Sequence, residues 1–231
     1  AGFSAGLPGL SRPFSCYVFH VFFGRGERVF STAGPVVESR SSDSSVTSDR
    51  VDCITAKVER CDNVQSAIAA FAKIANLKTA DIGIGWVGEP GRSALEGISI
   101  VLDASASVVA WIGYDVLQDK KVLSALSSLS NIRAHHAKPL LRWLMERDVD
   151  LRSISLDTTI AAYLLDPSDN KFDIQQVLER YTSFSIHIGG AEESGQLDFG
   201  SSNSDNAQRI CDEALAVSLM ADPILKALDK Q

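Results

Sequence analysis

The chain has 231 residues, of which 45% are hydrophobic and 22% are charged, and it carries a net charge of −7. This profile is typical of a soluble globular protein. The acidic balance argues against a domain whose main task is to grip a phosphate backbone, because such surfaces are usually basic. No apolar run is long enough to span a bilayer, so the sequence predicts a cytoplasmic protein without a membrane partner.

Two N-terminal segments differ in composition from the rest of the chain. Residues 1–31 are predicted to be an appendage of unknown role, in which residues 16–23 form one strand-like run. Residues 32–50 are rich in Ser, Thr and Asp and bury too little apolar area to offset their ordering entropy, so a flexible linker is predicted. The main domain is expected to span residues 51–231. The sequence lacks an initiator Met, and we expect it to be a piece of a longer protein.

The first part of the domain is predicted to contain strands and one helix. A weakly alternating strand covers residues 51–58, and Asp62 is expected to cap a helix with Phe71 and Ile74 on its apolar face. Three further strands are predicted at residues 80–87, 99–102 and 108–112, separated by Gly, Pro and Ser.

The second part is predicted to be mostly helical. In chain order, the pattern predicts a helix over 116–129, a strand at 131–134, a helix containing 140–145, helices over 154–165 and 172–181, a polar loop over 183–204, and a last helix with apolar positions from Ile210 to Leu228. Ser155 or Asp157 is expected to cap the helix over 154–165. Strands that precede helices, with alternation in the middle, are typical of a mixed α/β or α+β domain.

Three glycines, at positions 83, 85 and 88, match the G-x-G-x-x-G pattern of dinucleotide sites. In that motif the last glycine opens a helix whose N-terminus holds the pyrophosphate. Here Glu89-Pro90-Gly91 follows, and then another predicted strand. We therefore interpret the glycines as the end of a strand beside a turn.

Histidine and cysteine spacing does not predict a metal site. The side chains of His135 and His136 diverge on either a strand or a helix, and no third ligand follows at helical spacing. The four cysteines are scattered, and we interpret them as buried free thiols in a reducing compartment: Cys16, Cys53, Cys61 and Cys211.

Several segments, taken in order, resemble the 3′–5′ exonuclease (proofreading) domain of bacterial-type DNA polymerase I. Residues 156–167 and 172–181 are similar to its D-T…Y-L-L-x-P…L-x-x-R-Y block. Residues 133–138 resemble the second exonuclease motif, residues 95–99 resemble the second strand, and the last helix corresponds to the third motif. The resemblance covers residues 51–231 and implies a ribonuclease-H-like fold, with a central mixed sheet flanked by helices, in agreement with the α/β (α+β) element order.

The departures from this family concern its metal ligands. Active members hydrolyse a phosphodiester with two divalent ions held by carboxylates. The resemblance places the first Asp-x-Glu pair within residues 82–85, with Ile82 and Ile84 at the vestigial positions, the second Asp at Leu140, and the water-orienting Tyr at Gln208. Of the ligands, Asp212 alone remains a carboxylate. The resemblance thus implies a degenerate domain with no catalytic residues, no metal site and no cofactor.

These departures lead to the hypothesis of a pseudo-exonuclease within a DNA-directed DNA polymerase. The domain would serve as a structural platform for the polymerase domain of the same parent chain in DNA replication and repair, and would meet DNA indirectly. Arg133, Lys138 and Arg142 form a modest basic cluster and are the candidates for weak nucleic-acid binding.

Two alternatives stay open. The first is an active exonuclease that uses Mg²⁺ or Mn²⁺ and a shifted ligand set, drawn from four carboxylates: Asp81, Asp103, Asp157 and Asp212. The second is a protein-interaction module unrelated to DNA synthesis, which the acidic balance favours. The sequence predicts no oligomeric state.

Overall fold

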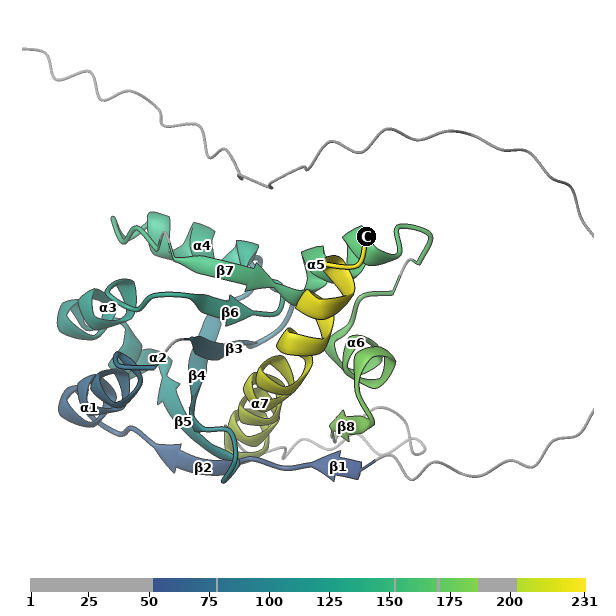
Figure 1. Cartoon of the computed structure of the whole chain (residues 1–231). Coiled ribbons are helices and arrows are strands. Elements are labelled where there is room, and N and C mark those ends of the chain that lie inside the picture. The colour runs from purple at the N-terminus through teal and green to yellow at the C-terminus, as the bar shows by residue number, and fades with distance from the viewer. Residues whose placement is uncertain (1–51, 78, 152, 170, 187–202) are drawn as a thin grey trace, which may run out of the picture. The chain divides into compact units, whose positions relative to one another are not determined.

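The structure is a computed structural model that describes residues 52–77, 79–151, 153–169, 171–186 and 203–231, with side chains from Asn206 onward in the last stretch (Figure 1). The predicted appendage at 1–31 and linker at 32–50 lie outside these residues. The domain boundaries therefore stay predictions.

A six-stranded mixed sheet forms the centre of the described part. Its strands, in spatial order, are β2 (Lys57–Arg60), β5 (Val108–Gly113), β4 (Leu95–Asp103), β3 (Ala80–Trp86), β6 (Ile132–Ala134) and β7 (Ile154–Asp157). The three strands β3, β4 and β5 pair antiparallel, whereas β2 on one side and β6 and β7 on the other pair parallel. A separate parallel pair is made by β1 (Asp52–Ile54) and β8 (Phe184–Ile186).

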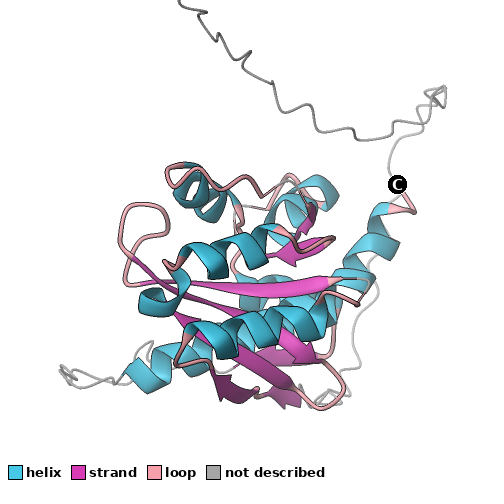
Figure 2. Ribbon diagram, turned by 90° about the vertical axis from the view of Figure 1, so that its left-hand side faces the viewer, coloured by secondary structure: helices cyan, strands magenta, loops and turns pink. Residues whose placement is uncertain are grey.

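Helices lie on both sides of this sheet (Figure 2). One face is covered by α1 (Val64–Ile74), α2 (Tyr114–Leu117), α3 (Lys120–Ser127) and α4 (Lys138–Met145), which share one hydrophobic core with β3, β4 and β5. The long helix α7 (Asn203–Leu228) crosses the other face, and α5 (Thr158–Leu165) and α6 (Ile174–Tyr181) pack against it (Figure 1). The predicted class, a mixed α/β domain with a central mixed sheet flanked by helices, is confirmed.

The strand predicted over residues 51–58 is wrong, because two short strands in different sheets take its place. β1 pairs with β8 and β2 pairs with β5, with Ala56 between them. The backbone N–H of Ala56 donates to Asp212 Oδ1 on α7 at 2.7 Å. This contact lies between the two short strands, where the sequence pattern indicates a continuous strand.

Helix boundaries differ from the predictions wherever a polar cap determines them. Asn63, not Asp62, caps α1 and exchanges hydrogen bonds with Ser66. The predicted helix over 116–129 is two helices, because Asp119 caps α3 at a new start. The segment predicted as a helix over 154–165 begins as β7, and Asp157 then caps α5. Part of the loop predicted over 183–204 is β8, and the remainder up to residue 202 lies outside the described part.

Cysteines follow the prediction in part: Cys61 and Cys211 are buried free thiols, whereas Cys53 is exposed. Among the helices that the structure describes, none is long and apolar enough to cross a bilayer.

Candidate functional site

Helix α7 lies directly on two glycines of β3. A Cβ added at Gly83 would overlap the backbone oxygen of Ile210, and a Cβ added at Gly85 would overlap the end of the Ile210 side chain. The hydroxyl of Ser99 on β4 donates to the same Ile210 oxygen at 2.7 Å. Small residues on β3 and β4 thus permit a close approach of helix to sheet. Both glycines lie within the last four residues of β3, and a turn follows the strand, as predicted.

Side chains of β3 alternate between the two faces of the sheet, and the predicted vestigial positions lie on the face opposite α7. Ile82 and Ile84 point into the core on the α1–α4 side, and Leu140 of α4 is fully buried in the same core. The positions of β3 that face α7 are Gly83 and Gly85, because successive side chains of a strand point to opposite faces. The structure therefore does not bring Ile82, Ile84 and Leu140 together with α7. The sequence prediction placed the pair within residues 82–85 and assigned it to the isoleucines, although the glycines alternate with them.

Asp212, the remaining carboxylate of the third motif, is 3% exposed and holds the junction between β1 and β2. Its Oδ1 accepts hydrogen bonds from the Ala56 N–H at 2.7 Å and from Gln208 Nε2 at 3.0 Å. The Gln208 amide also donates to the Ala56 carbonyl at 2.9 Å. Gln208 and Asp212, one helical turn apart, thus bind both backbone groups of Ala56.

We expect Asp212→Ala to lower the free energy of unfolding by about 2 kcal/mol, because it leaves the buried Ala56 N–H without its acceptor. Asp212→Asn keeps an oxygen at this position and should lose less than half as much. Urea denaturation of the two variants checks this prediction. Equal losses of stability in both variants would mean that the charge, rather than the acceptor, is required.

Arg133 is buried between two carboxylates. Its guanidinium donates to both oxygens of Asp81 on the neighbouring strand β3, at 2.5 and 2.8 Å, and to Asp222 of α7 at 3.0 Å. The residue is 8% exposed. This ion-pair network connects β3, β6 and α7.

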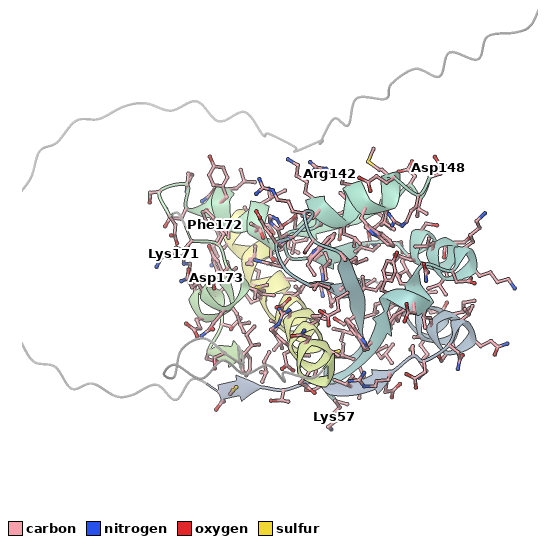
Figure 3. All side chains as sticks on the ribbon, turned by 180° about the vertical axis from the view of Figure 1, so that it is seen from behind. Lys57, Arg142, Asp148, Lys171, Phe172 and Asp173 are labelled. Carbon is pink, nitrogen blue, oxygen red and sulfur yellow. The ribbon has the colours of Figure 1, made fainter. Side chains whose placement is uncertain are left out.

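The predicted basic cluster is therefore divided between the interior and the surface. Lys138 and Arg142 are exposed on α4, and Figure 3 shows Arg142 on the outside of the domain, whereas Arg133 is engaged inside it. The structure does not unite the three cations on one surface. Nucleic-acid binding by Lys138 and Arg142 stays a prediction.

Asp157 joins the starts of two helices. Its carboxylate accepts hydrogen bonds from the backbone of Thr159 at 3.0 Å, which caps α5, and of Ala137 at 2.8 Å, which lies at the start of α4. His135, in the same turn, contacts Thr158 Oγ1 through Nδ1 at 2.9 Å, while His136 is exposed.

The pKa of His135 is lowered to about 4, because burial of the imidazole outweighs the attraction of Asp157. A histidine in the unfolded chain has a pKa of about 6.5. Between pH 6.5 and 4, the imidazole is therefore protonated in the unfolded chain but stays neutral in the folded chain. The free energy of unfolding therefore carries no penalty from His135 above pH 6.5. It is expected to fall by roughly 1–2 kcal/mol toward pH 4, allowing for the partial exposure of the ring. Urea midpoints at pH 7 and 4.5 measure this loss. A His135→Gln variant with an unchanged pH dependence would contradict the prediction.

The four carboxylates of the shifted ligand set each serve a local structure. Asp81 pairs with Arg133, Asp157 caps α5, and Asp212 holds Ala56. Asp103 is the last residue of β4 and accepts hydrogen bonds from Ser105 and from the Ala106 backbone in the turn that follows. Across the described ranges, no three His, Cys, Asp or Glu side chains gather where a metal ion could be held. The residues that the structure describes therefore offer no ligand set for a two-metal centre.

A hollow of about 600 Å³ lies apart from these residues, at the ends of β2, β4 and β5 and near the start of α7. Its lining includes the aromatic rings of Trp111 and Tyr114 and four charged side chains: Arg60, Asp62, Glu96 and Asp115. Three carboxylates and one guanidinium make this lining unfavourable for a phosphate group.

The sheet order and the helix across one face define a ribonuclease H-like fold of the 3′–5′ exonuclease class. Residues 92–189 match the family described as DNA polymerase I, ribonuclease H-like domain. The predicted resemblance to the 3′–5′ exonuclease domain of DNA polymerase I is confirmed over this segment.

Solved structures agree on the fold. The Pol1 POL domain from M. smegmatis, in complex with DNA primer-template and dNTP, has a TM-score of 0.57 and 19% identity over 74% of this chain and 28% of that chain. The Nibbler EXO domain from Aedes aegypti has a TM-score of 0.55 and 11% identity over 75% and 89% of the two chains. Escherichia coli RNase D, an exoribonuclease involved in structured RNA processing, has a TM-score of 0.55 and 12% identity over 75% and 46%. No curated protein matches the sequence.

Proposed function

We propose that this chain is a catalytically degenerate 3′–5′ exonuclease-like domain that serves as a structural platform for the polymerase domain of a DNA polymerase I. In this proposal the parent protein acts in DNA replication and repair in the cytoplasm, and the domain itself meets DNA indirectly. The observation that carries the proposal is the packing of α7 on Gly83 and Gly85, where Ile210 fills the space that a carboxylate side chain on β3 would need.

The chemistry of the two-metal reaction supports the proposed loss of catalysis. Two hard dications each require several oxygen ligands, and an alternate pair of acidic residues on a strand is the usual source of some of them. In β3 the corresponding pair is two glycines, and Ile210 fills the space beside them. The Asp212 carboxylate already accepts two hydrogen bonds from groups that hold the β1–β2 junction. Loss of several members of such a ligand set is expected to abolish catalysis.

The platform role is supported by the family match and by the size of one structural neighbour. This fold accounts for 28% of the M. smegmatis chain, whose structure contains a polymerase domain bound to DNA. The match of residues 92–189 is to a domain of the same polymerase family. A folded domain without metal ligands retains its packing surfaces, and these are what a platform requires.

A nuclease assay tests the proposal. The chain is incubated with a labelled single-stranded oligonucleotide and Mg²⁺ or Mn²⁺, and the release of 3′ nucleotides is measured. We expect no release above a protein-free control. Metal-dependent release that Asp212→Asn abolishes would contradict the proposal, since this variant keeps the Ala56 contact but weakens a metal ligand.

A further inference from the structure

The hollow of about 600 Å³ forms where three strands of the sheet meet at one end. β2 and β5 are parallel and pair Arg60 with Trp111, so their carboxyl ends lie side by side. β4 is antiparallel to β5 and pairs Gly97 with Gly113, so its first residues lie at the same end of the sheet. The chain enters α2 directly after Gly113, and the first turn of this helix forms another part of the lining.

Two aromatic rings of the lining are held in place by packing. Gly97 leaves room for the indole of Trp111, because a Cβ added at Gly97 would lie 2.7 Å from Trp111 Cη2. The phenol ring of Tyr114 makes an edge-to-face contact with Trp143, with ring centroids 6.3 Å apart. Fixed aromatic rings attract ammonium and guanidinium groups that approach their faces.

Carboxylates outnumber cations in this lining by three to one. The carboxylates are those of Asp62, Glu96 and Asp115, and the guanidinium is that of Arg60. None of these four side chains belongs to an ion pair within the residues that the structure describes. The lining therefore has an uncompensated negative charge beside its aromatic rings.

The Glu96 carboxylate also has an unsatisfied acceptor. Its Oε2 is buried and accepts no hydrogen bond from any described group, and it is the one buried side-chain N or O atom of the described residues in this situation. A buried carboxylate oxygen without a donor is costly, and nearly all such atoms in folded proteins are paired. Because Glu96 lines the hollow, a ligand that enters it can supply the missing N–H donor.

We propose that this hollow binds an organic cation that carries alkylammonium or guanidinium groups. The carboxylates would accept its charged N–H groups, and the rings of Trp111 and Tyr114 would cover its alkyl part. The volume lies within the range of small-molecule sites. A metal ion does not fit, because no three ligating side chains of the described residues gather closely enough to hold one. The proposal is independent of the proposed platform role.

Two sources could provide this cation: a free polyamine, or a basic side chain of a protein. Isothermal titration calorimetry of the 231-residue chain distinguishes them with spermidine and with a lysine peptide capped at both ends, and Mg²⁺ is the third probe. We expect one of the organic probes to bind at least about tenfold more tightly than Mg²⁺, and to bind more weakly as the salt concentration rises. The organic probe that binds more tightly identifies the source. Absence of binding by both organic probes, or equally tight binding of Mg²⁺, would overturn the proposal.

Glu96→Gln removes one charge of the lining and keeps the size of the side chain. We expect it to weaken binding of the organic probe about tenfold, because a charge-assisted hydrogen bond is lost. Asp115→Asn, at an exposed position of the lining, is the second variant and should also weaken binding. The control Asp148→Asn removes an exposed carboxylate in the turn after α4 and should leave binding unchanged. Equal weakening by Asp148→Asn would show that the net charge of the chain attracts the probe, and unchanged binding in Glu96→Gln and Asp115→Asn would show that the hollow is not the site; either result would overturn the proposal.

Discussion

Replacement of Gly83 by alanine is expected to lower the free energy of unfolding by about 3 kcal/mol, because the new methyl group would collide with the backbone of α7. The obstacle is the carbonyl oxygen of Ile210, which also accepts the Ser99 hydroxyl. A backbone atom in the middle of a long helix cannot rotate away as a side chain can. The helix would have to move off the sheet and lose part of the core that it covers.

Gly88→Ala is the matched control for this substitution. Its added Cβ would lie 3.5 Å from Ser93 Cβ, an ordinary van der Waals contact. We expect a change within about 0.5 kcal/mol, since alanine also restricts the unfolded chain. Denaturant unfolding of both variants measures the difference. Equal stability of Gly83→Ala and Gly88→Ala would show that the backbone of α7 is not in contact with Gly83.

The second large effect is expected at Arg133. Arg133→Leu should lower the free energy of unfolding by about 4 kcal/mol, because it leaves the carboxylate of Asp81 buried without its partner. The Asp81 side chain is 7% exposed, whereas that of Asp222 is 72% exposed and remains hydrated. Asp222→Asn is therefore the control and should cost less than about 1 kcal/mol.

A double variant distinguishes the loss of the ion pair from the cost of leaving the Asp81 carboxylate buried and unpaired. Asp81→Val/Arg133→Met replaces both charges with apolar groups and should recover most of the lost stability. Thermal unfolding of the single and double variants measures this recovery. If Arg133 instead contacts nucleic acid, Arg133→Leu should leave stability unchanged and weaken DNA binding in a salt-dependent way.

The order of strands and helices could be predicted because it depends on local periodicity. The apolar spacing in α1 and α7 is helical, the alternation in β3 is typical of a strand, and the short apolar run of β5 is typical of a buried strand. The secondary-structure predictions that were wrong concern segments whose conformation depends on contacts between residues distant in the sequence. The break between β1 and β2 is set by Asp212, which lies 156 positions away from Ala56 in the sequence.

The candidate site could be predicted only in part for the same reason. The spacing of the family motifs placed the first pair of vestigial ligand positions only approximately in β3. The register of that strand against α7 decides whether isoleucine or glycine faces the helix. A shift of one residue reverses every side chain of a strand. Arg133 was interpreted as a surface cation, although it stands between the apolar residues Ile132 and Ala134 in a short strand. That position is itself a sign of a buried, paired charge.

Manganese binding tests the absence of a two-metal centre most directly. The electron paramagnetic resonance signal of hydrated Mn²⁺ is recorded as the 231-residue chain is added, because binding to protein broadens that signal. With glycine and Ile210 in place of carboxylates, the signal of the free ion should persist at equal concentrations of chain and ion. Uptake of two Mn²⁺ ions per chain, lost in Asp212→Ala, would contradict the account.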